Sequence, residues 1–218
     1  MPNRVFESSA LVKVRRAASW FPVLYLAILL VAQLRADWPA LAQPRLDVDT
    51  VLAVSASTYL AILLGTYRRK PRFLADRHDL VAIITTVIAI DAFGVIARQP
   101  ITQGDAYVPA GILIILGTAL AGWSAMSLGK SFSLLPQARN LVMIGPYAFL
   151  RHPMYAGGIL ITLGELWLRW TPLTLVVCGV AFVAQLVRLQ MEEHLLTEQF
   201  PSYAAYRNRT SALIPGVY

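Results

Sequence analysis

Six apolar stretches, separated by short polar segments, set the pattern of this sequence. They cover residues 17–34, 48–67, 80–97, 108–128, 155–168 and 173–189, and the fifth is the shortest. A helix needs about 20 mostly apolar residues to cross the hydrocarbon core of a bilayer. Serine, threonine and glycine are tolerated there because a helix satisfies its own backbone hydrogen bonds. The pattern predicts an all-α fold, a polytopic transmembrane helical bundle of about six spans.

Lysine and arginine are distributed unevenly between the two ends of these predicted spans. Of the 19 basic residues, 15 fall on the side that carries both termini. The other side has four, namely Arg35, Arg45, Arg98 and Arg169. Because cytoplasmic loops of membrane proteins are enriched in lysine and arginine, the distribution predicts that the N and C termini are both cytoplasmic.

The composition agrees with membrane insertion. Hydrophobic residues make up 57% of the chain and charged residues only 14%, whereas a soluble domain has about 25% charged residues. The basic loops explain the net charge of +7, so no nucleic-acid partner is expected. The single cysteine, Cys178, lies in an apolar stretch and is read as a small buried residue, not as a metal ligand.

Two acidic residues interrupt the predicted spans: Asp91 in the third and Glu165 near the far end of the fifth. An ionisable group at membrane depth is costly and suggests function by default. Asp91 could equally sit neutral or form a hydrogen bond to a neighbouring helix. A small-molecule transporter, which would place polar groups along several spans, is therefore kept as the non-enzyme alternative.

The chemistry concentrates in the second half of the chain. We divide the whole chain into two parts: an N-terminal scaffold with three spans, residues 1–107, and a core with three spans and a C-terminal interfacial helix, residues 108–218. The first polar cluster contains Gly145-Pro-Tyr147, Arg151-His-Pro-Met-Tyr155 and Gly157. Pro153 suits the first position of a helix, so Arg151 and His152 would lie at its positive N-terminus, where free N–H groups can bind an anionic group.

The second polar cluster follows the sixth stretch. Arg188 and Glu192 are spaced i, i+4 and share a helix face, whereas Glu193 faces elsewhere. Tyr203 and Tyr206 continue an apolar and aromatic stripe that favours a helix at the membrane surface. Taken singly, each of these residues also fits a structural role without catalytic function. The arginine and histidine could lie at the membrane interface, the glutamates could be solvated, and the tyrosines could belong to an aromatic belt.

Taken together, the two clusters resemble the isoprenylcysteine carboxyl methyltransferase family, and the related phospholipid N-methyltransferases share a similar core. The resemblance covers residues 120–215 and includes Leu128-Gly-Lys-Ser-Phe132, Leu196 and Phe200. It implies a membrane enzyme that uses S-adenosylmethionine at its cytoplasmic side, without a Rossmann fold. A lipophilic acceptor would enter from the bilayer. The first three spans carry no motif that matches.

The resemblance also implies roles for individual residues. The catalytic set, which would orient the acceptor or hold the charged end of the cofactor, is Arg188, Glu192 and Arg151. The cofactor-binding set is Tyr147, His152, Pro153, Tyr155, Gly157, Glu193, Tyr203 and Tyr206. No metal is expected, because the sulfonium of S-adenosyl-L-methionine is already an activated leaving group and the protein mainly supplies alignment.

The sequence does not determine which chemical group accepts the methyl group. It could be a prenylcysteine-like acid, a phospholipid amine (as in a phospholipid N-methyltransferase) or a thiol, and a non-catalytic membrane scaffold is a further alternative. We expect a multi-pass protein of a bacterial inner (plasma) membrane, with the bilayer as its partner. Every functional expectation requires the Arg151–Tyr155 turn and the Arg188–Glu193 helix to converge around a nucleoside-sized cavity.

Overall fold

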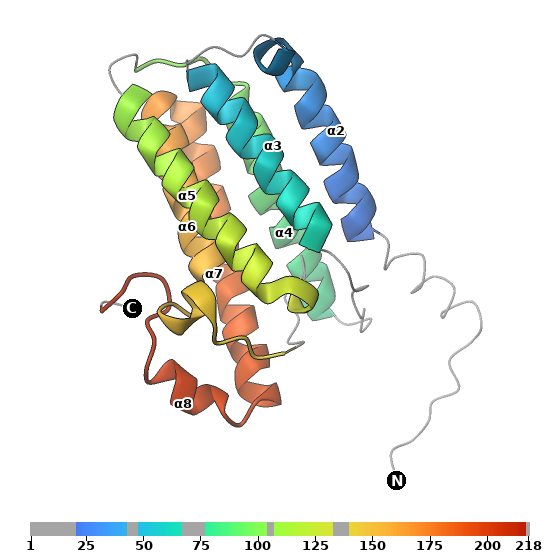
Figure 1. The fold of residues 1–218 in the computed structure, drawn as a ribbon, viewed down its shortest axis with the longest axis vertical. Helices are drawn as coiled ribbons and strands as arrows, with labels where there is room; N and C mark the ends of the chain where they lie inside the picture. The colour runs from blue at the N-terminus through green and yellow to red at the C-terminus, as the bar shows by residue number, and fades with distance from the viewer. Residues whose placement is uncertain (1–20, 43–47, 67–76, 104–106, 133–139, 217–218) are drawn as a thin grey trace, which may run out of the picture.

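Six long helices lie side by side in the computed structural model (Figure 1). The structure describes residues 21–42, 48–66, 77–103, 107–132 and 140–216. The long helices are α2 (Phe21–Ala42), α3 (Val48–Thr66), α4 (Arg77–Ala97), α5 (Tyr107–Leu128), α6 (Pro153–Leu168) and α7 (Pro172–Gln199). Three short elements accompany them: the 3-10 turns η2 (Gly129–Ser131) and η3 (Gly145–Ala148), and helix α8 (Tyr203–Arg207).

The all-α prediction is confirmed for the part of the chain that the structure describes. Each of the six apolar stretches corresponds to one long helix, although α2 and α7 both extend well beyond the predicted C-terminal ends. Two of the described helices, Val108–Leu128 and Pro172–Gln199, are long and apolar enough to cross a membrane. Passage of all six through a bilayer, and the side on which the termini lie, stay predictions.

Helices α5 and α6 pack against each other without intervening side chains at two positions. A Cβ added to Gly157 would lie 2.7 Å from the carbonyl oxygen of Gly117 and 2.8 Å from the amide nitrogen of Ala121. At Gly164 it would lie 2.8 Å from the carbonyl oxygen of Ala110. Small residues let helix backbones approach this closely, which is the usual packing device inside membranes. The close packing of α6 against α5 therefore determines where the first turn of α6 lies relative to α5.

The other helices enclose the space beside this pair. α3 packs against both α2 and α5, and α4 packs against α7. The outward sides of α5 and α7 carry exposed apolar side chains, among them Ile115, Leu116, Val176 and Val183. Such a surface suits lipid contact, because exposed apolar area of this extent is unusual for a protein in water.

Both acidic residues of the predicted spans have partners. The Tyr25 hydroxyl on α2 donates a 2.8 Å hydrogen bond to Asp91 on α4. Glu165 forms an ion pair with Arg169, which is 6% exposed and donates through Nε to the carbonyl of Gln99 at 3.0 Å. The Tyr25–Asp91 contact joins α2 to α4, and the Glu165–Arg169 pair at the end of α6 is linked to Gln99 through Arg169. Such structural contacts are the alternative to a transport pathway.

The close approach of α5 and α6 predicts that Gly157→Ala destabilises the protein. The added methyl meets backbone atoms that cannot rotate away, and overpacking of this kind costs roughly 1–3 kcal/mol. Thermal unfolding of the purified protein in detergent measures the effect as a lower unfolding temperature. Gly179→Ala on α7 is the matched control, because a Cβ there meets nothing within 4 Å. Equal unfolding temperatures for the two variants would contradict the packing described.

Candidate active site

The turn before α6 is held in place by its own backbone and by α8. Gly145 adopts φ +60°, and a Cβ there would lie 2.6 Å from the Ser127 hydroxyl oxygen, so glycine is required. The buried hydroxyl of Tyr206 donates to the carbonyl of Tyr147 at 2.7 Å, with Leu150 O at 3.3 Å. This contact joins two segments that are far apart in the sequence.

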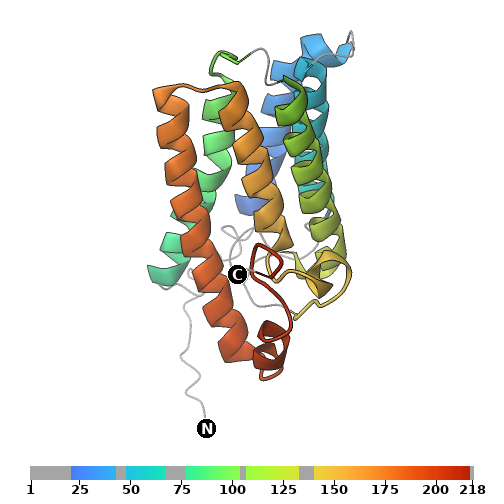
Figure 2. The ribbon, with the colours of Figure 1, turned by 90° about the vertical axis from the view of Figure 1, so that its left-hand side faces the viewer.

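The chain after α8 returns to the start of α6 (Figure 2). The amide of Arg151 donates to the carbonyl of Ser211 at 2.8 Å, and the amide of His152 donates to that of Ala212 at 3.0 Å. The Arg151 guanidinium adds hydrogen bonds from Nη1 to the carbonyls of Arg207, at 3.1 Å, and Thr210. Arg151 therefore anchors the C-terminal segment.

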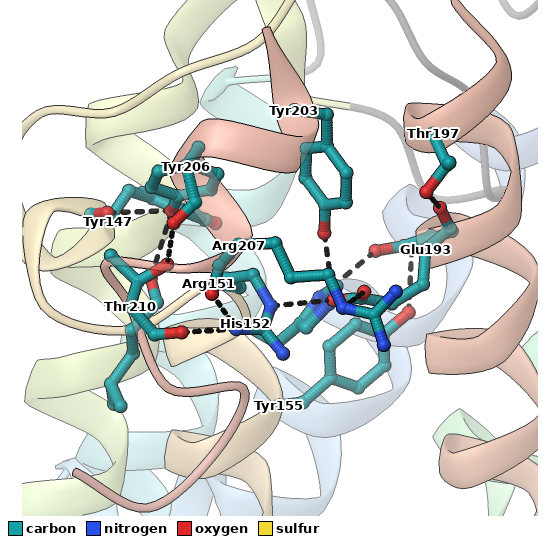
Figure 3. Close-up of polar contacts among 12 residues, drawn as sticks. Tyr147, Arg151, His152, Tyr155, Glu193, Thr197, Tyr203, Tyr206, Arg207 and Thr210 are labelled. Atoms are coloured by element: carbon teal, nitrogen blue, oxygen red, sulfur yellow. Dashed lines mark hydrogen bonds and ion pairs between the residues drawn. The ribbon is translucent and has the colours of Figure 1, made fainter. Parts of the chain in front are cut away.

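Glu193 of α7 stands at the centre of this contact (Figure 3). Its Oε1 accepts hydrogen bonds from Arg151 Nε at 2.9 Å and Tyr203 Oη at 2.8 Å, and lies 2.8 Å from His152 Nε2. Burial alone would raise the pKa of the Glu193 carboxyl, but the hydrogen bonds from His152, Tyr203 and Arg151 outweigh it and lower the pKa to about 2. The carboxylate is therefore ionised at neutral pH.

Glu192, the adjacent residue, projects to the other side of His152. Its Oε1 accepts a 2.6 Å hydrogen bond from the Tyr155 hydroxyl, and its Oε2 lies 3.8 Å from His152 Nδ1. One turn earlier on α7, the Arg188 guanidinium lies 5.5 Å from the centre of the Tyr155 ring. The predicted convergence of the Arg151–Tyr155 turn with the Arg188–Glu193 helix is therefore confirmed.

A cavity of about 310 Å³ opens at this meeting point, within the size range of small-molecule sites. Seven of the residues singled out from the sequence line it: Tyr147, Arg151, His152, Tyr155, Arg188, Glu192 and Tyr206. From there the cavity continues between the helices past Ile161 to Glu165 at the far end of α6. It is therefore a long space with a polar end and a mainly apolar body.

Four other residues singled out from the sequence lie outside the lining of this cavity. Pro153 is buried at the first position of α6, and Gly157 faces α5. Glu193 and Tyr203 lie behind the lining, where they hold His152 and Arg151. The structure thus gives these four a supporting place, and their contact with a cofactor stays a prediction.

Several lining residues escaped the sequence reasoning. Gln185 belongs to the same helix face as Arg188 and Glu192, at i, i+3 and i+7, so helical spacing alone could have found it. Tyr59 on α3 and Asn140 in the loop before η3 also line the cavity, but no motif marks them. The first three predicted spans therefore supply one wall of the site, in addition to any role as scaffold.

No cluster for a metal ion occurs in the described residues: no three His, Cys, Asp or Glu side chains are grouped so as to hold one. The candidate chemistry of the cavity comes instead from Arg188, Glu192, His152 and Tyr155, which combine one guanidinium, one carboxylate, one imidazole and one phenol. Such a set can bind a zwitterion or orient a carboxylate.

Two groups of known proteins are similar in sequence. Protein-S-isoprenylcysteine O-methyltransferase B of Arabidopsis thaliana is 31% identical over 114 residues, which are 48% of this chain and 57% of that protein. Nickel-cobalt-cadmium resistance protein NccN of Alcaligenes xylosoxydans is 28% identical over 119 residues, 51% of this chain and 53% of that protein. Cobalt-zinc-cadmium resistance protein CzcN of Cupriavidus metallidurans is 28% identical over 159 residues, with 69% of each chain covered. The chain thus spans just over half the length of the first two.

A solved structure is also similar, that of the eukaryotic intramembrane Ras methyltransferase ICMT, the isoprenylcysteine carboxyl methyltransferase. The match covers 89% of this chain and 86% of that chain, with 17% sequence identity and a TM-score of 0.39. A TM-score this low supports no inference about the site.

The central position of Glu193 predicts a loss of stability in Glu193→Gln. The amide cannot accept three charge-assisted hydrogen bonds as a carboxylate does, so we expect a loss of roughly 2–3 kcal/mol at pH 7. Glu198→Gln is the matched control, because Glu198 is exposed on the same helix and pairs with the exposed His194.

The pH dependence gives a second readout of the same group. Because its folded-state pKa lies near 2 and the ordinary value is 4.5, the stabilisation by Glu193 is complete above pH 5 and declines as the pH falls toward 2. Unfolding temperatures of the wild type should therefore decrease over this range more steeply than those of Glu193→Gln. Parallel profiles would contradict the assigned role.

The family model described as phospholipid methyltransferase matches residues 106–202. This segment begins at α5 and ends just before α8, so it contains the turn, α6 and α7 that form the polar end of the cavity. The plant relative, which is similar over 114 residues, is an isoprenylcysteine O-methyltransferase. Residues 106–202 therefore match the phospholipid methyltransferase family, and the chain is similar over about half its length to a protein-S-isoprenylcysteine O-methyltransferase.

Proposed function

We propose that this protein is an integral membrane methyltransferase that transfers a methyl group from S-adenosyl-L-methionine to a lipophilic or small acceptor. The reaction we favour is O-methylation of a carboxylate, like that of an isoprenylcysteine carboxyl methyltransferase. The observation that carries the proposal is the meeting of Tyr155, Arg188 and Glu192 at the polar end of a cavity that continues between apolar helices.

The polar end of the cavity fits the chemical character of the methyl donor. The Glu192 carboxylate, 25% exposed, can pair with a sulfonium or an ammonium group. Tyr147 and Tyr155 offer aromatic faces, and Leu141 and Leu196 offer apolar walls for a purine ring. When bound, the donor supplies a methyl group on a positively charged sulfur. The neutral thioether formed by methyl transfer is the leaving group, and it needs no metal assistance.

The residues of this chain then have distinct tasks. Arg188, held over the Tyr155 ring, suits a carboxylate of the acceptor, because a guanidinium binds carboxylates in a bidentate manner. Arg151 acts as a positioning residue, since its guanidinium holds Glu193 and the C-terminal segment. A carboxylate or thiolate acceptor needs no base, whereas an amine would have to give up a proton to Glu192 or His152.

A phospholipid N-methyltransferase or a thiol S-methyltransferase would use the same polar end with another acceptor. The transporter alternative is weaker, because Asp91 and Glu165 each have a partner within the bundle. We further propose that the polar end faces the cytoplasm of a bacterial cell and that α2–α4 complete the acceptor wall.

Cofactor binding tests the proposal directly. Isothermal titration of the purified protein with S-adenosylhomocysteine should give saturable 1:1 binding, because the donor site is formed by the chain itself. Incubation of membrane extracts with methyl-labelled donor and the protein, followed by mass spectrometry, should reveal a labelled lipid-soluble product. No binding at high micromolar ligand would overturn the proposal.

Two substitutions separate the roles of the charged residues. Arg188→Gln should lower turnover by about 100-fold with little change in cofactor affinity, because it removes a charge that orients the acceptor. Glu192→Gln should instead weaken cofactor binding by about tenfold, because it removes the negative charge beside the donor's positive groups. Titration and single-turnover assays provide both numbers, and the exposed Glu198→Gln is again the control. A cofactor affinity unchanged in Glu192→Gln would contradict the assignment of that carboxylate.

A further inference from the structure

Gln185 of α7 is a buried polar residue that lines the cavity and has one unsatisfied side-chain oxygen. It is 7% exposed, lines the cavity, and its Oε1 has no hydrogen-bond partner. An unpaired amide oxygen costs free energy wherever water is excluded, and more so at membrane depth. Tyr155 and Glu192, which line the same cavity, are hydrogen-bonded to each other, whereas Oε1 of Gln185 is left without a partner in the described residues.

The space in front of this amide is open because of a glycine. Gly158 of α6 faces Gln185, and an added Cβ there would lie 3.6 Å from Oε1 and 3.8 Å from Nε2. Both residues line the cavity. Unlike Gly157, whose missing side chain admits α5, Gly158 leaves room beside the amide within the cavity itself.

The position of Gln185 relative to the charged end indicates what could reach it. It lies three residues before Arg188, or roughly 4.5 Å farther from the charged end along the helix axis. It lies seven residues before Glu192, on the same face. A molecule held by Arg188 and extending along the cavity would therefore pass Gln185 before it reaches Ile161 and the apolar body.

We infer that Gln185 is a specificity-determining residue, and that the acceptor carries a hydroxyl or amide N–H next to the group that is methylated. The inference rests on the proposed function. The unpaired Oε1 would accept a hydrogen bond from this group, and the amide nitrogen can donate to a hydroxyl in return. A plain hydrocarbon acid leaves the amide unpaired and binds less well, since a site built for a hydrogen bond discriminates against analogues that lack it.

Two acids of equal length test the inference: 2-hydroxydecanoic acid and decanoic acid, each titrated into detergent-solubilised protein saturated with S-adenosylhomocysteine. The wild type should bind the hydroxy acid about tenfold more tightly. Gln185→Leu, which keeps the volume and removes the amide, should bind both acids equally. Gln185→Met is a second variant in case the first does not fold, and Gln190→Leu, at an exposed position of the same helix, is the control that should keep the preference.

Failure of the Gln185 inference can be distinguished from failure of the methyltransferase proposal. Equal affinity of the wild type for the two acids, or binding of neither, would overturn the inference. So would a preference that persists in Gln185→Leu and Gln185→Met. Binding of S-adenosylhomocysteine is measured first in every variant and should not change, because Gln185 lies beyond Arg188. Loss of that binding in the wild type would instead overturn the methyltransferase proposal.

Discussion

The polar end of this bundle depends on one buried carboxylate. Glu193 of α7 contacts His152 and Arg151 at the start of α6 and Tyr203 of α8, so one side chain joins three elements. Three hydrogen bonds to one oxygen favour the ionised carboxylate and outweigh its burial, which is why its pKa falls to about 2. Replacing the charge would leave several buried donors unpaired at once.

This arrangement divides the work between two adjacent glutamates. Successive residues on a helix face different directions, so Glu193 turns toward α8 while Glu192 turns toward the cavity. Glu192 keeps a partly exposed carboxylate beside Tyr155 and His152, where a cationic ligand can approach it. A site that must orient a reacting group benefits from this separation, because the residues in contact with ligand are held by others that are not.

Packing defines the rest of the cavity. Glycines let α5 and α6 meet at backbone distance, whereas α2, α3 and α4 stand on the other side of the space. The wall formed by these first three helices contributes Tyr59 and Asp91, so the cavity is shared between both halves of the chain. The phospholipid methyltransferase family match begins only at residue 106, and this part of the site lies outside it.

The sequence by itself determined the helices and the pairing of the two polar clusters. Hydrophobic length and periodicity are local properties, so the starts of α4, α5, α6 and α7 could be read to within a few residues. The motifs around Arg151–Tyr155 and Arg188–Glu193 pointed to one site through their joint resemblance to isoprenylcysteine carboxyl methyltransferases, since each residue taken singly also fits an ordinary interfacial role.

Only the tertiary structure decided which of these residues face the cavity. Pro153, Gly157, Glu193 and Tyr203 carry the family pattern as clearly as His152 does, yet they lie behind the lining or against α5. Conversely, Tyr59 has no signature in the sequence, and helical spacing places Gln185 on the face of Arg188 without revealing that its side-chain oxygen is unpaired. Which face of a helix meets a ligand depends on the neighbours packed around it, and these contacts between distant residues are not encoded in local spacing.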